Sequence, residues 1–294
     1  MKEQTTVQTS LLGIAKKAKS DKRYRFRNLY RELNEEMLRD SWRLLRKDAA
    51  LGVDGVSAAE YEANLEENIH QLVERLKRKR YRAKLVRRHY IPKGEGRMRP
   101  LGIPATEDKL LQLAVKRLLE AIYEQDFLSC SYGYRPRVGA LEAVDQLTVK
   151  LQFGGYHHVV EADIKGFFDN LSHEWLMRML AERIDDQAIL RLIKKWLKAG
   201  VLDTDGKVLR PEGGTPQGGV ISPILANVYP CTTRSICGSR ECSSAVVKAG
   251  HSCTDTQTTS CAVSRGKKMP NASTVSWKSV CGSSNWNSRR RRHG

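Results

Sequence analysis

The stretch that decides how this chain folds is Glu161-Ala-Asp-Ile-Lys-Gly-Phe-Phe-Asp-Asn170, which places a carboxylate at the end of a short apolar run. Residues 158–164 predict a buried strand, with Gly154-Gly155 as the turn before it and Gly166 as its end. A strand that delivers Asp163 to a sheet edge can build a metal-held phosphate site, because Mg²⁺ usually takes one or two protein carboxylates together with substrate phosphates. The simpler alternative is that Asp163 only ends a strand.

A second informative stretch is a loop rich in glycine and proline, Pro211-Glu-Gly-Gly-Thr-Pro-Gln-Gly-Gly-Val-Ile-Ser-Pro-Ile-Leu-Ala-Asn227. It runs into an apolar segment with helical spacing. Paired glycines let a backbone approach a ligand without side-chain hindrance. Gln217 lies between them and offers an amide to a base or a sugar. A plain tight turn has the same composition, so this loop does not by itself indicate a binding site.

The third stretch, residues 85–104, predicts two short strands joined by a glycine hairpin at residues 94–96. Lys93, Arg97 and Arg99 lie on or beside the hairpin. Three cations on a tip that folds over a cleft suit a triphosphate, because they neutralise its charge and position it. The alternative is a charged and solvated hairpin.

Capping residues and a turn signal predict where several other elements begin. They comprise the capping box of Ser57 with Glu60, the helix starts Thr106, Ser172 and Asp185 or Asp186, and the hairpin turn Asp205-Gly206.

The first two blocks, in this order, resemble the palm of a reverse transcriptase, specifically that of the group II intron reverse transcriptase/maturase family. Residues 162–170 are similar to that family's first catalytic-aspartate motif, and residues 214–229 to its template-and-nucleotide-positioning motif. Residues 85–104 resemble its fingers. The similarity begins near Gly52 and stops at Tyr229. Retron and diversity-generating reverse transcriptases also have aspartate motifs of this kind, but the extended match over residues 214–229 favours the intron lineage.

The resemblance implies an enzyme that copies RNA into DNA and helps intron RNA to fold and splice. Its partners would be group II intron RNA, an RNA template, a DNA primer and deoxynucleoside triphosphates (dNTPs). Two Mg²⁺ ions would be held by carboxylates from two chain segments. The implied catalytic residue and metal ligand is Asp163, with the Ile164 carbonyl as a second metal contact. The residues implied at the nucleotide are Lys93, Arg97, Arg99, Phe168 and Gln217. Those implied at the template or other RNA are Tyr134, Arg135 and Gly218.

Composition agrees with a partner of negative charge. The 294 residues carry a net charge of +18 with a pI near 9.7, the balance of a polyanion binder, although basic solvated surfaces also occur without nucleic acid. The sequence has no apolar run of membrane-spanning length, and residues 1–6 lack a secretory pattern, so we expect a cytoplasmic protein.

Histidines and cysteines predict no metal centre. His157, His158 and His173 flank the aspartate motif without the spacing of a metal cluster, so structural roles are expected. Six of the seven cysteines follow position 230 and lack the paired spacing of a zinc site.

The predicted fold class is α+β, a right-hand polymerase with fingers and an incomplete palm, and not a doubly wound sheet. We expect a basic helical extension over 1–50, fingers over 51–150, a partial palm over 151–230 and a disordered tail over 231–294. Within the extension, residues 21–27 interleave cations with aromatics, a pattern that can grip RNA but also fits a solvated linker.

The tail differs in composition from the rest of the chain. Residues 1–230 contain 31 leucines and residues 231–294 contain none, while 20 of these 64 tail residues are Ser or Thr. A segment without large aliphatic side chains cannot bury enough surface to offset its ordering entropy. One interpretation is a natural disordered basic tail.

A sharper hypothesis is a shifted reading frame. The family pattern continues with an apolar helix and a Tyr-Ala-Asp-Asp turn that carries the other catalytic carboxylates, and this sequence has neither. Residues 254–260, back-translated with chosen synonymous codons and read from the third base, yield Arg-Tyr-Ala-Asp-Asp-Phe. We therefore expect a truncated reverse transcriptase without polymerase activity. The alternatives are a non-catalytic basic RNA-binding remnant and an inert pseudogene product.

Overall fold

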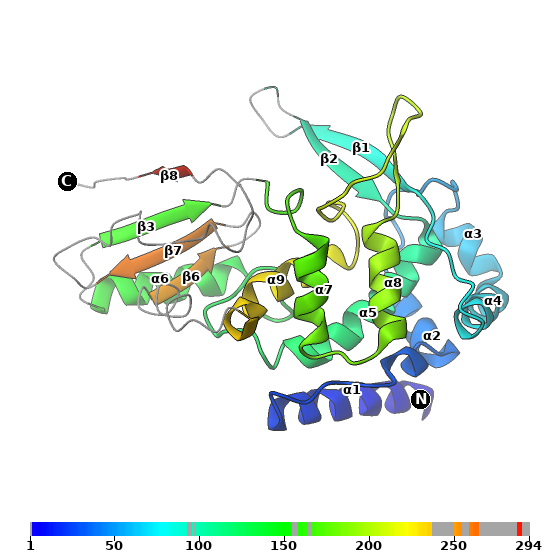
Figure 1. Ribbon diagram of the computed structural model, residues 1–294, viewed down its shortest axis with the longest axis horizontal. Coiled ribbons are helices and arrows are strands. Elements are labelled where there is room, and N and C mark those ends of the chain that lie inside the picture. The colour runs from blue at the N-terminus through cyan, green and yellow to red at the C-terminus, as the bar shows by residue number, and fades with distance from the viewer. Residues whose placement is uncertain are drawn as a thin grey trace.

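The fold was analysed in a computed structural model of the chain. It describes the backbone of residues 2–92, 96, 98–154, 158–163, 166–236, 250–254, 259–264 and 287–289, and the side chains of residues 6–92, 96, 98–154 and 166–229. The elements, labelled in Figure 1, are helices α1 (Lys2–Ser20), α2 (Glu35–Leu44), α3 (Ala58–Ala63), α4 (Leu65–Lys77), α5 (Thr106–Tyr123), α6 (Ala140–Phe153), α7 (His173–Ala181), α8 (Gln187–Leu197) and α9 (Ser222–Ile236), the 3₁₀ helix η1 (Leu29–Glu32), and strands β1 (Val86–Pro92), β2 (Met98–Ile103), β3 (His158–Asp163), β4 (Val201–Leu202), β5 (Val208–Leu209), β6 (Gly250–Thr254), β7 (Thr259–Ser264) and β8 (Asn287–Arg289).

Helix α5 is the centre of the helical body. Its apolar positions recur at three- and four-residue spacing, and the stripe predicted from that spacing is buried: Leu110, Leu111, Ala114, Leu118 and Ile122 are each at most 1% exposed. Helices α1, α2 and α9 pack against it. One hydrophobic cluster runs from Val7 to Tyr229, so α1 and α2 share a core with the segments predicted as fingers and palm. The domain boundaries at residues 50, 150 and 230 stay predictions.

The basic stretch 21–27 lies against the helical body through intramolecular ion pairs. Arg25 and Arg27 both contact the Asp185 carboxylate, at 3.5 and 2.8 Å. Lys22 pairs with Asp126 at 3.3 Å. These contacts join residues far apart in the sequence, which accounts for this charge pattern without any RNA.

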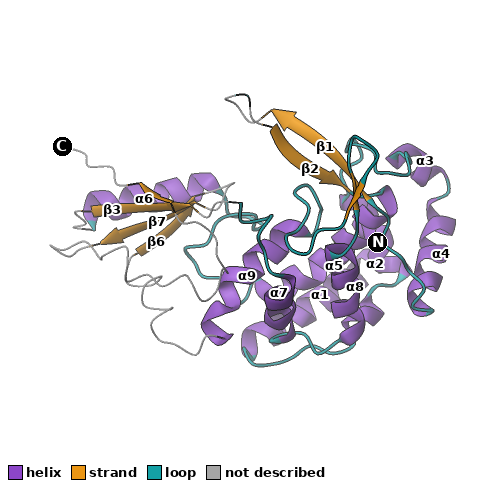
Figure 2. Ribbon diagram, turned by 45° about the horizontal axis from the view of Figure 1, so that its top comes forward, coloured by secondary structure: helices purple, strands orange, loops and turns teal. Residues whose placement is uncertain are grey.

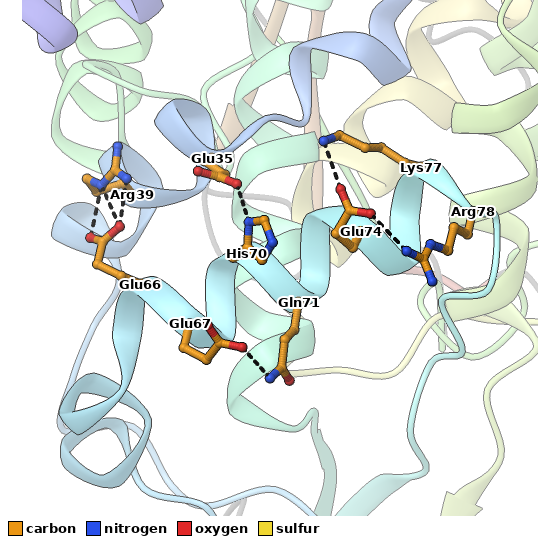
Figure 3. A network of polar contacts seen from close by, with 9 residues as sticks. All are labelled: Glu35, Arg39, Glu66, Glu67, His70, Gln71, Glu74, Lys77 and Arg78. Carbon is orange, nitrogen blue, oxygen red and sulfur yellow. Dashed lines mark hydrogen bonds and ion pairs between the residues drawn. The ribbon is translucent and has the colours of Figure 1, made fainter.

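A network of polar contacts fastens α4 to α2 (Figure 3). Arg39 on α2 binds Glu66 at 2.6 Å, and His70 on α4 lies 2.8 Å from Glu35 at the start of α2. The hydrogen bond to Glu35 raises the pKa of His70. Such exposed pairs contribute little each, so the buried leucines between the two helices carry most of the stability of this contact.

Two four-stranded sheets are present in the described residues, and Figure 2 shows them apart from each other. In one, of order β2-β1-β4-β5, β1 and β2 form the predicted antiparallel hairpin, with Arg88 opposite Gly102 and Ile91 opposite Arg99. In the other, of order β6-β7-β3-β8, the predicted strand β3 ends at Asp163. The mixture of helices with small, mainly antiparallel sheets confirms the α+β fold class.

Three short segments of the tail pair with strand β3 or with one another. β7 and β8 flank β3 antiparallel, with Thr259 and Asn287 opposite Asp163, and β6 extends the sheet beyond β7. Ladder hydrogen bonds come from the backbone, and Ser and Thr do not interfere with them, so a strand can pair without leucines. The other tail residues beyond 236 lie outside the described part.

Most predicted helix starts are confirmed, and one is wrong. Ser57 and Glu60 form the capping box of α3. Ser172 caps α7, and Asp186 rather than Asp185 caps α8. Thr106 does not cap α5, whose N-cap residue is Ala105; the Thr106 hydroxyl instead donates to the Val56 carbonyl at 2.7 Å.

Candidate nucleotide and template site

The glycine-rich loop 214–219 is fixed to the turn that follows the aspartate strand. The Gly214 N–H donates to the Leu171 carbonyl and the Thr215 N–H to the Phe168 carbonyl, each at 2.7 Å. Gly214 has φ +80°, and a Cβ there would lie 2.7 Å from the Phe168 carbonyl oxygen. Only glycine fits this position, because any other side chain would meet backbone.

The same loop is fixed on its other side to strand β2. The Gly102 N–H donates to the Gln217 carbonyl at 2.6 Å. A Cβ on Gly102 would lie 2.7 Å from the Pro216 side chain, and one on Gly218 (φ +103°) would lie 3.0 Å from the Gly102 carbonyl oxygen. The loop therefore joins the Phe168 turn to the hairpin, so the three stretches that the sequence singles out meet at one place.

Hydroxyl groups close the loop onto the start of α9. The Ser222 hydroxyl donates to the Pro216 carbonyl at 2.9 Å and lies 2.8 Å from the Thr215 hydroxyl. All three residues are largely removed from solvent, so the bonds are protected from competition with water. Gln217, half-buried, is held by its backbone at the end of this closed turn.

The hairpin carries cations on both faces. Strand alternation puts Arg87 and Arg99 on one face and Arg88 on the other, in register with Gly102. Arg99 is half-buried, whereas Lys93 and Arg97 lie outside the described residues. Arg88 is a cation at the site that the motif pattern does not indicate; the alternation of β1 together with its register to Gly102 is the signal that finds it.

Tyr134 and Arg135 lie near Phe168 but differ in their surroundings. Tyr134 has φ +55° and is 41% exposed, and its ring meets Phe168 edge-on with 6.1 Å between centroids. The Arg135 side chain is only 12% exposed; it pairs with Glu124 at 3.0 Å and donates to the Ser131 carbonyl at 2.6 Å. Tyr134 thus faces the site, while Arg135 holds the loop that carries it.

The residues implied as metal ligands lie at the end of β3. Asp163 is the last residue of that strand. The Asp163 side chain and the whole of Ile164 lie outside the described part of the chain. Among the described residues no group of three or more His, Cys, Asp or Glu side chains could hold a metal ion. A lone strand-end carboxylate suits Mg²⁺ chemically but does not make the donor set that a pair of these ions requires.

A buried carboxylate on α5 binds the segment that leads into the hairpin. Asp108 on α5 accepts a hydrogen bond from the Tyr81 hydroxyl at 2.5 Å and one from the Lys84 N–H at 3.0 Å. Burial raises the pKa of Asp108 to about 6, against the lowering effect of these two hydrogen bonds. It lines a cavity of about 20 Å³ together with Thr215 and Pro216, so this ionisable group lies directly behind the glycine loop.

Comparison with known proteins agrees with this geometry. Residues 91–231 match the family described as reverse transcriptase (RNA-dependent DNA polymerase). The chain is 45% identical over 165 residues to the group II intron-encoded protein LtrA of Lactococcus lactis subsp. cremoris, which is 56% of this chain and 27% of that protein. It is 40% identical over 182 residues to Escherichia coli protein YkfC, which is 60% of this chain and 47% of that protein. It is 24% identical over 129 residues to the nuclear intron maturase 4, mitochondrial, of Arabidopsis thaliana, which is 44% of this chain and 16% of that protein.

The chain thus spans about a quarter to a half of the length of the first two relatives. No helix in its described part is both long and apolar enough to cross a bilayer. The matched residues contain β2, β3, the Phe168 turn and the glycine loop, which are the segments that the structure brings together. Residues 91–231 therefore match a reverse transcriptase domain, and the chain is similar to group II intron-encoded proteins and intron maturases.

Proposed function

We propose that this chain is the fingers and part of the palm of a group II intron-encoded RNA-directed DNA polymerase and maturase, and that it binds intron RNA. The observation that carries the proposal is the glycine loop, bonded on one side to Phe168 and on the other to Gly102. This arrangement joins a nucleotide-facing turn to a cationic hairpin. A cytoplasmic location is part of the proposal.

Each site residue has a role in this proposal. Arg99, with Lys93 and Arg97, would hold the triphosphate of an incoming dNTP, and Arg88 adds positive charge nearby. Phe168 would pack under the sugar and disfavour a 2′-hydroxyl. Gln217 and Gly218 would lie along the RNA template opposite a DNA primer, with Tyr134 stacking on a base and Arg135 supporting the Tyr134 loop.

Reverse transcriptases depend on divalent metal, and Mg²⁺ would activate the primer hydroxyl and stabilise the leaving pyrophosphate. Asp163, with the Ile164 carbonyl, would be this chain's contribution to the metal site. Residues 231–294 contain only two acidic residues, Glu241 and Asp255, and lack the Tyr-Ala-Asp-Asp turn that would supply the remaining carboxylates. We infer that the 294-residue chain binds RNA without polymerising DNA.

Primer extension tests this inference. The purified chain is given an RNA template, a labelled DNA primer, dNTPs and Mg²⁺, in parallel with its Asp163→Ala variant. We expect no extension from either, together with salt-dependent binding of RNA by both. Extension by the original chain that the variant lacks would show that the metal site is complete.

The second candidate is a non-catalytic RNA-binding remnant that assists intron folding, and the net charge of +18 favours it. Faster folding of intron RNA in the presence of the inactive chain would support that role. Proteolysis throughout residues 1–230 would instead support an inert product.

The origin of the tail is a separate proposal. A frameshift near codon 230 would join a foreign reading frame to an intact family sequence. Sequencing the coding DNA tests it: the alternate frame should encode an apolar helix followed by Tyr-Ala-Asp-Asp, and a frame without that turn would rule out the frameshift.

A further inference from the structure

A groove of about 740 Å³ runs between helices α7 and α8. Both helices expose part of their facing surfaces to it, and Figure 1 shows them side by side next to α5. Its apolar lining comes from Met177, Ala181 and Leu190, and its polar lining includes both acids and bases. This groove is larger than the cavity beside Asp108, and none of the site residues above lines it.

One wall of the groove is a row of cations on α8. Arg191, Lys194 and Lys198 recur at three- and four-residue spacing, so they lie on one exposed face over about 10 Å of helix. None of the three has a side-chain hydrogen bond or an ion pair to another residue in the described part of the chain. Three like charges in a row repel one another, which favours a bound polyanion.

Two neighbouring cations differ from this row because their side chains have partners within the chain. Lys195, one position further along α8, donates to the Tyr81 carbonyl at 2.6 Å and does not line the groove. Arg178, on the α7 wall, is paired with Glu174 at 2.7 Å. The unpaired charge is therefore concentrated on the α8 wall of the groove and is not spread evenly around these helices.

The groove also reaches the glycine loop. His173, at the start of α7, lines the groove, and its Nε2–H donates to the Gly214 carbonyl at 2.6 Å. Gly214 is the residue that docks the loop onto the Phe168 turn. A ligand in the groove would thus lie one side chain away from the candidate template site.

We propose that the groove binds RNA backbone, with phosphates on Arg191, Lys194 and Lys198. This would be a second RNA site in addition to the candidate template site at the glycine loop. A row of unpaired cations along one wall suits a regularly charged chain of phosphates. The apolar floor is too small to bury one face of an amphipathic acidic peptide helix, which disfavours a protein partner. The proposal rests on the proposed function in that intron RNA is the expected polyanion.

The test compares two triple variants of the full chain that lose the same charge. The groove variant is Arg191→Gln, Lys194→Gln and Lys198→Gln. The control variant is Lys79→Gln, Arg80→Gln and Arg82→Gln, three exposed cations after α4. Fluorescence anisotropy with a short single-stranded RNA at several salt concentrations gives the affinity and its salt dependence, and thermal unfolding verifies that each variant is folded.

We expect the groove variant to lose about tenfold or more in affinity, and its salt slope to fall by about 2, because three phosphate contacts are removed. The control should lose about threefold or less. Equal losses in the two variants would overturn the groove site while leaving RNA binding, and hence the proposed function, in place.

Two further outcomes are decisive. Failure of the original chain to bind RNA at all would overturn the proposed function and the groove site with it. The other outcome concerns competition by polyglutamate. If polyglutamate displaces labelled RNA from the original chain as effectively as unlabelled RNA does, and does not displace it from the groove variant, the groove binds acidic proteins instead.

Discussion

At Gly214 the backbone has φ +80° and two carbonyl oxygens, from Phe168 and Asp169, lie 2.7 Å from where a Cβ would stand. Gly206 in the β4–β5 turn has nearly the same conformation, φ +81°, but open space around it. Substitutions at the two glycines therefore separate two free-energy costs of adding a Cβ, that of the left-handed conformation and that of steric overlap with nearby backbone.

We predict that Gly206→Ala lowers the free energy of unfolding by about 1 kcal/mol, since left-handed backbone disfavours a Cβ. Gly214→Ala should cost about 3 kcal/mol, because steric overlap with backbone adds to the same strain. Urea unfolding measures both values. Equal losses would mean that the loop moves freely away from the Phe168 turn, contrary to the fixed geometry described above.

Asp108 makes stability depend on pH in an unusual direction. Its pKa rises from 3.8 in the unfolded chain to about 6 in the folded protein, so the folded state holds the proton more tightly. Its contribution to stability is fully present below pH 4 and is lost as pH rises to about 6. The loss amounts to about 3 kcal/mol, since one pKa unit corresponds to about 1.4 kcal/mol.

The Asp108→Asn variant tests this. The free energy of unfolding of the original chain minus that of the variant should fall by about 2.4 kcal/mol between pH 4 and pH 7, because the amide does not ionise. Asp145→Asn, on the exposed face of α6, is the control. A difference for Asp108→Asn that stays constant across this range would contradict the buried ionisation.

At the scale of elements, α8 depends on its cap more than α7 does. The Asp186 carboxylate accepts hydrogen bonds from the N–H groups of Ala188, at 2.9 Å, and Ile189, at 3.3 Å, and from the N–H of Tyr30, also at 2.9 Å. It therefore starts a helix and also joins that helix to the η1 segment. Ser172 accepts one bond at 3.4 Å at the start of α7.

We predict that Asp186→Ala costs about 2–3 kcal/mol and Ser172→Ala about 0.5–1 kcal/mol. The larger value follows because Asp186→Ala leaves three backbone donors without their partner. Denaturant unfolding gives the two costs, and hydrogen exchange should show faster exchange at Tyr30 in the Asp186 variant alone. Similar costs for both variants would show that the contact to η1 contributes nothing.

At the scale of the whole molecule, the hydrophobic core formed by the described side chains runs from Val7 to Tyr229. Strands β7 and β8 pair with β3, and β6 pairs with β7, through backbone ladders. We expect these ladders to open at a lower free energy than the helical body.

We therefore predict that a chain shortened to residues 1–236 unfolds cooperatively within about 5 °C of the full chain, since about 1 kcal/mol corresponds to a few degrees at this size. Calorimetry measures the midpoint. Hydrogen exchange should be faster in β3 and unchanged in α5. Loss of the cooperative transition on shortening would show that the tail is part of the core.

Local sequence chemistry determined a large part of this protein. Alternating and helical apolar spacing predicts the β1–β2 hairpin, β3 and the buried stripe of α5, because these patterns follow from the periods of strand and helix. The paired glycines predict a close backbone approach, expected toward a ligand, whereas in the structure Gly214 and Gly218 lie close to other backbone of the chain. The aspartate and glycine-loop motifs by themselves also indicate the reverse transcriptase family.

Only the tertiary structure decided which residues far apart in the sequence come into contact. From the sequence, Arg135 is a candidate template contact and residues 21–27 are a stretch that fits either RNA binding or a linker. In the structure, Arg135 pairs with Glu124, and Arg25 pairs with Asp185. The unpaired row on α8 and the contact of His173 with Gly214 have no local pattern. Whether a charge is free or paired is set by long-range packing, which a run of neighbouring residues does not encode.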